Sequence, residues 1–141
     1  MPLWQIQHHP SAFSADQKKA LSDAIANIYH DLIGLPKFYA VVIFSPNEDI
    51  FVGGEPDPKF VRITMSHIAR ESEIKEGPAR WFQTHVDAVL KPYIQDRGMR
   101  WEYSYDNSPR MFWKINGMVP PDEDSEMERK WRKENRAVSY G

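Results

Sequence analysis

Residues 14–34, SADQKKALSDAIANIYHDLIG, carry the pattern that decides the fold. Ser14 and Gln17 stand three positions apart, which is the spacing of a capping box at the start of a helix. Apolar residues then recur at the spacing of one helical face, namely Leu21, Ile25, Ile28 and Leu32. Gly34 and Pro36 end this pattern. The stretch therefore predicts an amphipathic helix with one face packed on a core.

A strand is predicted on each side of this helix. Residues 2–7, PLWQIQ, alternate loosely between apolar and polar side chains, and proline is tolerated at the first position of a strand. Residues 38–44, FYAVVIF, form a nearly continuous apolar run, as expected for a strand that is buried on both faces. The first 45 residues are thus predicted to form a β-α-β unit.

The same order of elements is predicted a second time. Residues 60–68 and 99–105 alternate as strands, and the segment between them carries a helical stripe that ends near Pro92. This stripe consists of Phe82, Val86, Val89 and Tyr93, and adding 61 to each number of the first stripe gives its members. The match favours two fused copies of one unit, at about residues 2–45 and 58–105.

The remaining segments are predicted to be a loop and a tail. Residues 45–59 contain three prolines and Gly53-Gly54, which indicates a loop with a short hairpin around residues 50–52. Residues 110–120 are predicted to add a short strand. Residues 122–136 read as a solvated helix, with acids first and bases last, docked by Met127 and Trp131.

We therefore expect an α+β fold in which two fused β-α-β units form a four-stranded mixed sheet with two helices on one face. A C-terminal helical extension, residues 106–141, completes a single domain over residues 1–141. A chain of this length can bury a full core without disulfides.

Composition and charge exclude several classes of function. The chain has no cysteine, which excludes disulfides, thiolate metal sites and a thiol nucleophile. Lys and Arg number 18 against 20 Asp and Glu, so no basic field attracts nucleic acid or an anionic membrane. The sequence has no long apolar run and no secretory leader pattern. We expect a cytoplasmic protein with no nucleic-acid or membrane partner.

The histidines do not predict a metal site. His8 and His9 are adjacent on a predicted strand, so their side chains point to opposite faces and cannot readily share one ion. No glycine-rich phosphate loop follows a strand in the required context. We expect no metal and no cofactor.

Pro2 is the most informative single residue. If Met1 is removed, the chain begins with a secondary amine, and an α-amino group has a reference pKa of about 8. An apolar pocket would lower this pKa, which would make the amine a general base at neutral pH. The ordinary alternative is that Pro2 only affects the processing of the N-terminus.

Four residues, each within a longer stretch, carry a resemblance to a known family. Pro2 begins a strand, His30 lies near the end of SADQKKALSDAIANIYHDLIG, Arg70 ends FVRITMSHIAR, and Tyr103 lies in RWEYSY. The chain resembles the tautomerase superfamily over about residues 2–121, and within it the group containing cis-3-chloroacrylic acid dehalogenase. In that group an amino-terminal proline, a helix histidine, two arginines after the third strand, a tyrosine and a glutamate form the site. The resemblance therefore implies catalytic roles for Pro2, His30, Arg70 and Tyr103.

The chain departs from the family pattern at two positions. His67 stands where the resemblance places the first arginine, and Lys114, Ile115 or Asn116 stands where it places the glutamate. A histidine could replace the arginine as a weaker, pH-dependent donor that favours substrate binding as pH falls. The family's glutamate helps to activate water, so hydration of unsaturated acids is expected to be weak at most, and dehalogenation is not expected.

These residues predict a cofactor-independent tautomerase that acts on small 2-oxo or enol carboxylic acids. Arg70 would bind the carboxylate, Pro2 would shuttle the proton, and His30 and Tyr103 would bind or polarise the 2-oxo or enol oxygen. His30 lies opposite the apolar stripe of its helix, so we expect it to face solvent or a neighbouring subunit.

Oligomerisation is predicted as well, and two other interpretations stay open. A sheet with both helices on one face leaves its other face uncovered, and the resemblance implies a homotrimer with the sheets around a central axis. The first alternative is a catalytically reduced trimeric protein of the same fold that serves binding or interaction. The second is a dimeric α+β barrel of ferredoxin-like type.

Overall fold

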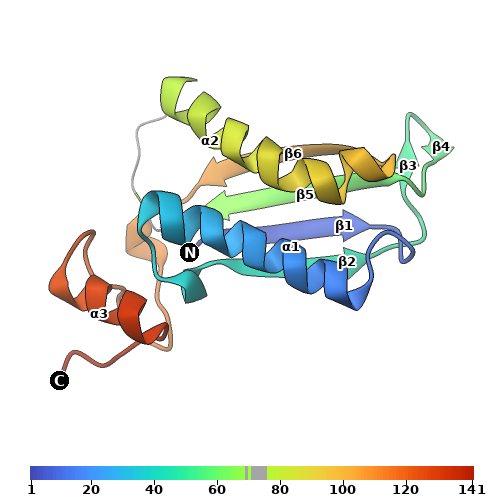
Figure 1. Ribbon diagram of the computed structural model, residues 1–141. Helices are drawn as coiled ribbons and strands as arrows, with labels where there is room; N and C mark the ends of the chain where they lie inside the picture. The colour runs from blue at the N-terminus through green and yellow to red at the C-terminus, as the bar shows by residue number, and fades with distance from the viewer. Residues whose placement is uncertain (69, 71–75) are drawn as a thin grey trace.

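The computed structural model, which describes residues 1–68, 70 and 76–141, is built on a four-stranded mixed sheet of order β2-β1-β5-β6 (Figure 1). Its strands are β1 (Leu3–His8), β2 (Val41–Pro46), β5 (Phe60–His67) and β6 (Arg100–Asn107). β1 is parallel to β2, β5 is parallel to β6, and the two pairs meet antiparallel between β1 and β5. Each predicted β-α-β unit therefore contributes one parallel pair. This adjacency is not that of a ferredoxin-like fold, where a β-α-β unit is split by another strand.

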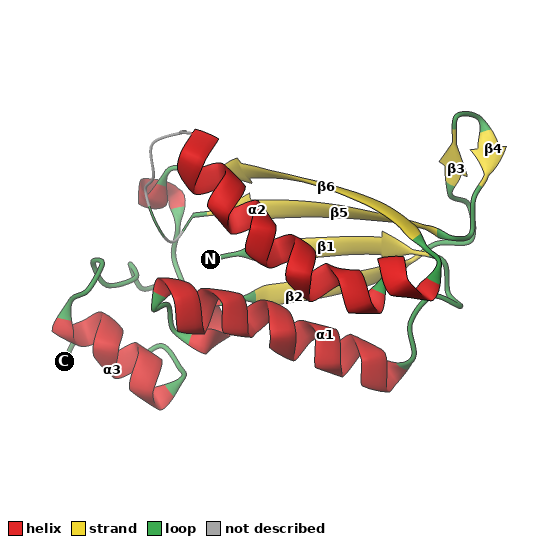
Figure 2. Ribbon diagram, turned by 45° about the horizontal axis from the view of Figure 1, so that its top comes forward, coloured by secondary structure: helices red, strands yellow, loops and turns green. Residues whose placement is uncertain are grey.

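Helices α1 (Ala15–Asn27) and α2 (Glu76–Leu90) lie side by side on one face of the sheet (Figure 2). The predicted capping box at the start of α1 is present. The Gln17 N–H donates to Ser14 Oγ over 3.2 Å, and the Ser14 N–H donates to Gln17 Oε1 over 2.9 Å. The core fills the space between the helices and the sheet, with fully buried members Trp4, Ile6, Ile63, Met65, Leu21, Ile25 and Val86.

The end of α1 differs from its prediction. At Ile28 the chain passes into a π-helix, Ile28–Leu32. Leu32, predicted in the buried stripe, is 45% exposed, whereas Tyr29 is 2% exposed. A π turn holds more residues than an α turn, so it rotates the following side chains out of the phase of the stripe.

The second strand is also shorter than predicted and is not buried on both faces. β2 begins at Val41 and is an edge strand of the sheet, and its Ile43 side chain is exposed. Residues Lys37–Tyr39 form a 3₁₀ helix instead. Phe38 and Tyr39 face the C-terminal tail, with ring centroids 6.0 and 6.3 Å from that of Trp131. The start of the apolar run therefore packs against the tail, and the rest of it forms β2 of the sheet.

The later half of the second helical stripe is displaced by one residue. Phe82 and Val86 are buried as predicted, but full burial then falls on Leu90 and Ile94 rather than on Val89 and Tyr93. The chain leaves α2 through the 3₁₀ helices Lys91–Tyr93 and Gln95–Arg97, and Gly98 then adopts a φ of +79°. Pro92 lies in the first of these turns, as its effect on helices requires.

The segment after β6 holds no extra strand, so that prediction is wrong. Arg110–Phe112 form a 3₁₀ helix, and a single bridge joins Ile115 to Met118. Asn116 and Gly117 adopt positive φ values of 50° and 78°, which turn the chain back before a strand can extend.

The predicted tail helix is present as α3 (Glu126–Glu134). Ser125 caps it by accepting the Glu128 N–H over 3.1 Å, and the buried Trp131 donates from Nε1 to the Val138 carbonyl over 2.8 Å. A small hairpin, β3 (Phe51–Val52) and β4 (Glu55–Pro56), projects at the end of the sheet opposite α3 (Figure 1). Among the described residues, no helix is both long and apolar enough to cross a membrane.

Candidate active site

The amino end of the chain lies where three strands of the sheet meet. Leu3 at the start of β1 is opposite Ser66 near the end of β5, so Pro2 is level with His67, which in turn is opposite Asn107 at the end of β6. Pro2 is buried, and its carbonyl accepts the Val41 N–H over 2.8 Å. Figure 1 shows this end of the sheet on the side of the molecule that carries α3.

The surroundings of the terminal amine disfavour a positive charge. Burial, together with the positive charges of Arg110 and Arg70, lowers the pKa of the Met1 amine to about 4. Arg110 was not among the residues predicted for the site. The geometry therefore places two guanidinium groups close to the chain's own amino end.

A buried hydrogen-bond chain runs beside this amine. Trp4 Nε1 donates to Tyr29 Oη over 2.7 Å, and Tyr29 Oη lies 2.7 Å from His67 Nε2. If the phenol hydrogen is donated to His67 Nε2, all three groups are satisfied and the imidazole is neutral with its hydrogen on Nδ1. Burial raises the pKa of the Tyr29 phenol, so it stays protonated.

His67 is poorly suited to the cationic role that the sequence predicts for it. Burial lowers its pKa to about 4, and the nearby N-terminal charge lowers it while Asp106 raises it. The ring is enclosed by Tyr29, Phe82 and Tyr105, with centroids 5.5, 5.0 and 5.3 Å away. The imidazole is therefore neutral between pH 5.5 and 8, where the sequence predicts a pH-dependent cation.

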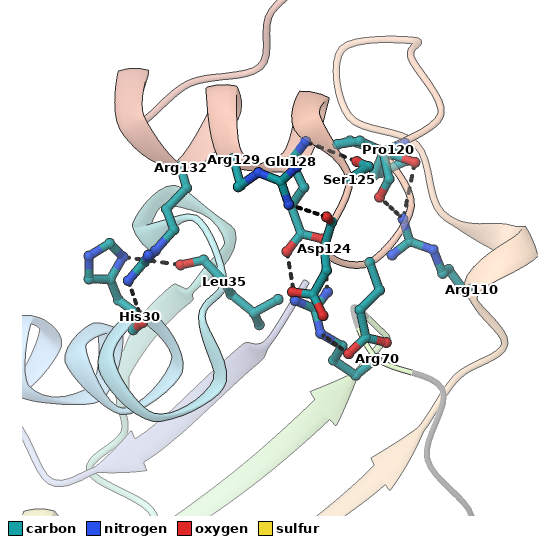
Figure 3. A network of polar contacts seen from close by, with 12 residues as sticks. His30, Leu35, Arg70, Arg110, Pro120, Asp124, Ser125, Glu128, Arg129 and Arg132 are labelled. Atoms are coloured by element: carbon teal, nitrogen blue, oxygen red, sulfur yellow. Dashed lines mark hydrogen bonds and ion pairs between the residues drawn. The ribbon is translucent and has the colours of Figure 1, made fainter.

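Arg70 is held by the C-terminal tail (Figure 3). Its Nη1 and Nη2 donate to Glu128 Oε2 and Oε1 over 3.1 and 2.6 Å, and its Nε lies 3.0 Å from Glu123 Oε1. The Arg70 side chain is 15% exposed, that of Glu128 4% and that of Glu123 58%. These carboxylates raise the pKa of the guanidinium, although burial opposes the shift.

Arg110 lies against the same tail. Its Nη2 donates to the Pro120 carbonyl over 3.0 Å and also to that of Pro121, and its guanidinium carbon is 5.5 Å from the centre of the Trp113 ring. Tyr39 packs edge-on to Trp113 at 4.9 Å, and burial raises the pKa of its hydroxyl. The Tyr39 hydroxyl and the Trp113 Nε1 are both buried and have no hydrogen-bond partner among the described residues.

His30 lies apart from Arg70, at the other end of the tail contacts (Figure 3). Its Nδ1 is 3.1 Å from the Leu35 carbonyl oxygen, and its own carbonyl accepts from Arg132 over 3.2 Å. Within the described part of the chain, the structure does not bring His30 into contact with Arg70 or His67.

Tyr103 lies away from the amine of its own chain. It is opposite Ile63 on β5, which is opposite Ile6 on β1, so it lies four residues before the end of its strand. At roughly 3.3 Å per residue this is about 13 Å along the sheet. Its hydroxyl donates to Asp87 over 2.7 Å, and burial together with this carboxylate raises its pKa.

The positions predicted for the missing glutamate supply no acid, as their residue types require. Lys114 and Asn116 are exposed, and Ile115 packs against the core. A buried carboxylate, that of Glu128 on α3, binds Arg70 instead. Within residues 1–68, 70 and 76–141, no cluster of three or more histidine or acidic side chains could hold a metal ion.

Residues 1–136 match the model of a family described as "Putative oxalocrotonate tautomerase enzyme". The chain belongs to this tautomerase family. The resemblance to the tautomerase superfamily predicted from the sequence is thereby confirmed. A search of curated proteins gave no match.

Solved structures agree with this membership. The chain is similar to native RhCC from Rhodococcus jostii RHA1, with 41% identity over 98% of this chain and 99% of that one and a TM-score of 0.92. A protein from the thermophilic fungus Aspergillus fumigatus is 39% identical over 99% and 98% of the two chains, with a TM-score of 0.90. N1, a member of the cis-3-chloroacrylic acid dehalogenase family, shares the fold at 15% identity over 94% and 97%, with a TM-score of 0.67.

The structure of this tautomerase family member adds three residues to the predicted site. Arg110 and Glu128 lie far along the chain from Pro2 and reach its neighbourhood through the fold of the tail. Tyr29 lies four positions after Ile25 and is 2% exposed. Two of the three had a signal in the sequence: Tyr29 has the helical spacing from Ile25, and Glu128 lies three positions before the tail anchor Trp131 and shares its helical face.

Proposed function

We propose that the protein is a cofactor-independent tautomerase in which Pro2, exposed by removal of Met1, acts as general base and acid on small 2-oxo or enol carboxylic acids. The observation that carries the proposal is the position of the chain's amino end. It lies at the start of a central strand, where burial and two arginines lower the pKa of the Met1 amine, and the buried Pro2 becomes the terminal residue of these surroundings once Met1 is removed. An amine that is neutral at physiological pH can accept a proton from carbon.

The proposed reaction moves one proton between carbon and oxygen. The neutral Pro2 nitrogen takes a proton from the carbon next to the 2-oxo group, and the electron pair of that C–H bond forms the enolate. The protonated Pro2 nitrogen then gives this proton to the enolate oxygen, which forms the enol and restores the neutral amine, and the reverse sequence returns the keto acid. Arg70 and Arg110 place positive charge near the amine, where it stabilises both the substrate carboxylate and the developing oxyanion.

The predicted role of Tyr103 fits this proposal only across a subunit boundary, because Tyr103 lies four residues along the sheet from the amino end of its own chain. Tyr103 is on β6, an edge strand that can approach a second chain. The exposed apolar side chains of Ile43, Met111 and Phe112 support association as well. We therefore keep the homotrimer as part of the proposal, to be measured by light scattering.

We propose no dehalogenase activity, and only weak hydration of unsaturated acids. Residues 114–116 supply no carboxylate to activate water, and the Glu128 carboxylate is already bound to both terminal nitrogens of Arg70.

A second candidate, a binding protein of the same fold without turnover, is favoured by one observation. Arg70, predicted to hold the substrate carboxylate, is paired with two carboxylates of its own chain. Intact mass separates the two candidates first, because retained Met1 would block the Pro2 nitrogen and favour the binding protein.

The decisive test is enol-keto conversion of a panel of 2-oxo acids by the protein that has lost Met1. We expect Pro2→Ala to lower kcat/KM at least about tenfold, since a positioned general base contributes about 10²- to 10⁴-fold and alanine retains a less constrained amine. Pro10→Ala, a change at an exposed proline, is the matched control and should leave turnover unchanged. Equal turnover by the Pro2→Ala protein would exclude the proposed mechanism.

A further inference from the structure

Arg70 contacts two tail carboxylates that differ sharply in their surroundings. Glu128 binds the outer edge of the guanidinium through both terminal nitrogens, and it is buried together with Trp131 on the inner face of α3. Glu123 lies in the loop before α3, is 58% exposed, and meets Arg70 through Nε at 3.0 Å. A buried, two-point ion pair is costly to break, whereas an exposed single contact is worth little.

The weaker of the two carboxylate contacts, that of Glu123, can be replaced by another carboxylate at one edge of the Arg70 guanidinium. A guanidinium offers two edges that can bind a carboxylate in its plane, one formed by Nη1 and Nη2 and the other by Nε and Nη2. Glu128 occupies the first edge and Glu123 the second. The same guanidinium lies close enough to the chain's amino end to lower the pKa of the amine there.

We propose that the Nε edge of Arg70 is the binding point for the substrate carboxylate, that Glu123 occupies it in the free protein, and that Glu128 is the positioning residue that fixes the guanidinium. On binding, the substrate carboxylate replaces that of Glu123, which returns to solvent. Glu128 stays in place and keeps the guanidinium fixed. This inference rests on the proposed function, and it assigns opposite effects to two acids five positions apart.

The test measures binding and turnover separately. Propionate carries a carboxylate but no 2-oxo group, so its Kd, followed by NMR, reports on the carboxylate site without any reaction. Conversion of phenylpyruvate gives KM and kcat. The variants are Glu123→Gln and Glu128→Gln, with Glu126→Gln as the matched control, because Glu126 is exposed, lies in the same segment and makes no ion pair with Arg70 among the described residues.

We expect Glu123→Gln to lower the propionate Kd and the KM about twofold to fivefold, the range set by an exposed ion pair, and to leave kcat unchanged. Glu128→Gln should raise the propionate Kd and the KM at least about tenfold and leave kcat unchanged. The substitution disturbs the alignment of the carboxylate site but not the proton transfer. Glu126→Gln should change neither. A general loss of structure would instead lower the active fraction and kcat.

Two results would overturn the proposal. One is an unchanged or raised Kd in the Glu123→Gln protein, whose exposed side chain can be altered without unfolding the chain. The other is a Kd lowered by Glu128→Gln, which would make Glu128 a second competitor rather than a positioning residue. If the wild-type protein converts no 2-oxo acid, the proposed function fails, but the propionate measurements still decide this inference.

Discussion

Two buried tyrosines provide a sharp test of the hydrogen-bond chain beside the amine. Tyr29 and Tyr39 are 2% and 1% exposed, so their conversion to phenylalanine removes the same atom from equally buried sites. The Tyr29 oxygen lies between Trp4 Nε1 and His67 Nε2, at 2.7 Å from each. The Tyr39 oxygen has no hydrogen-bond partner in the part of the chain that the structure describes. Tyr29→Phe and Tyr39→Phe should therefore change the free energy of unfolding by different amounts or in opposite directions.

The magnitudes follow from what each change leaves behind. Tyr29→Phe leaves the fully buried Trp4 N–H unpaired, which costs about 1–3 kcal/mol, and it also removes the bond to the half-buried His67, worth about 1 kcal/mol. We expect Tyr29→Phe to lower the free energy of unfolding by about 2–4 kcal/mol in total. Tyr39→Phe removes a hydroxyl that is buried and makes no hydrogen bond to the described residues. The substitution should therefore leave the free energy of unfolding unchanged or raise it by up to about 1–2 kcal/mol.

Urea unfolding followed by tryptophan fluorescence measures both variants. All samples need one protein concentration, because an oligomer's stability depends on it. For a chain of this size about 1 kcal/mol corresponds to about 2–4 °C in Tm, so Tyr29→Phe should lower Tm by about 4–16 °C. If Tyr29→Phe costs no more than Tyr39→Phe, the hydrogen-bond chain does not stabilise the native state as argued.

Three further changes test other parts of the structure. The pKa of His67 is lowered to about 4 in the native state, so the unfolded chain binds more protons between that value and the ordinary one of about 6.5, and stability should fall by up to about 3 kcal/mol as pH falls through this window. His67→Asn should reduce that fall in unfolding experiments at pH 7 and pH 4.5. Trp131→Ala should cost about 3–5 kcal/mol because the side chain is fully buried, while Trp81→Ala, at a half-exposed site, should cost far less. Leu32→Gln should leave Tm nearly unchanged, and a Tm lowered by several degrees would contradict the exposed position of Leu32.

Periodicity predicted the architecture wherever the backbone is regular. The stripe through Leu21, Ile25 and Ile28 and the alternation in β1 and β5 place the sheet and both helices correctly. The errors lie where local geometry departs from a fixed period. The π-helix displaces Leu32, and the 3₁₀ helix of residues 37–39 delays the second strand. Such turns depend on packing against distant parts of the chain, which a local pattern does not contain.

The site was predictable only in part, for a related reason. Pro2 was predicted from the chemistry of a free terminal amine and Arg70 from the family resemblance, and the structure brings both to one end of the sheet. Glu128 is separated from Arg70 by 58 residues, and its mixed-charge helix reads as solvated from the sequence. Burial of one acidic side chain on an otherwise polar helix is a tertiary event, set by the docking of Trp131.

The exchange of carboxylates at Arg70 bears on how the amine can keep its function during binding. A substrate that brought a new negative charge beside the amine would raise the amine's pKa and favour its protonated, inactive form. Replacing Glu123 avoids most of this effect, since one carboxylate leaves as another arrives. Glu128 and Arg110 stay in place throughout. The pKa that limits kcat/KM, which belongs to the free protein, should then nearly equal the pKa that limits kcat, which belongs to the complex. A rise of more than about one unit between them would mean that the substrate adds its charge to the site rather than exchanging it.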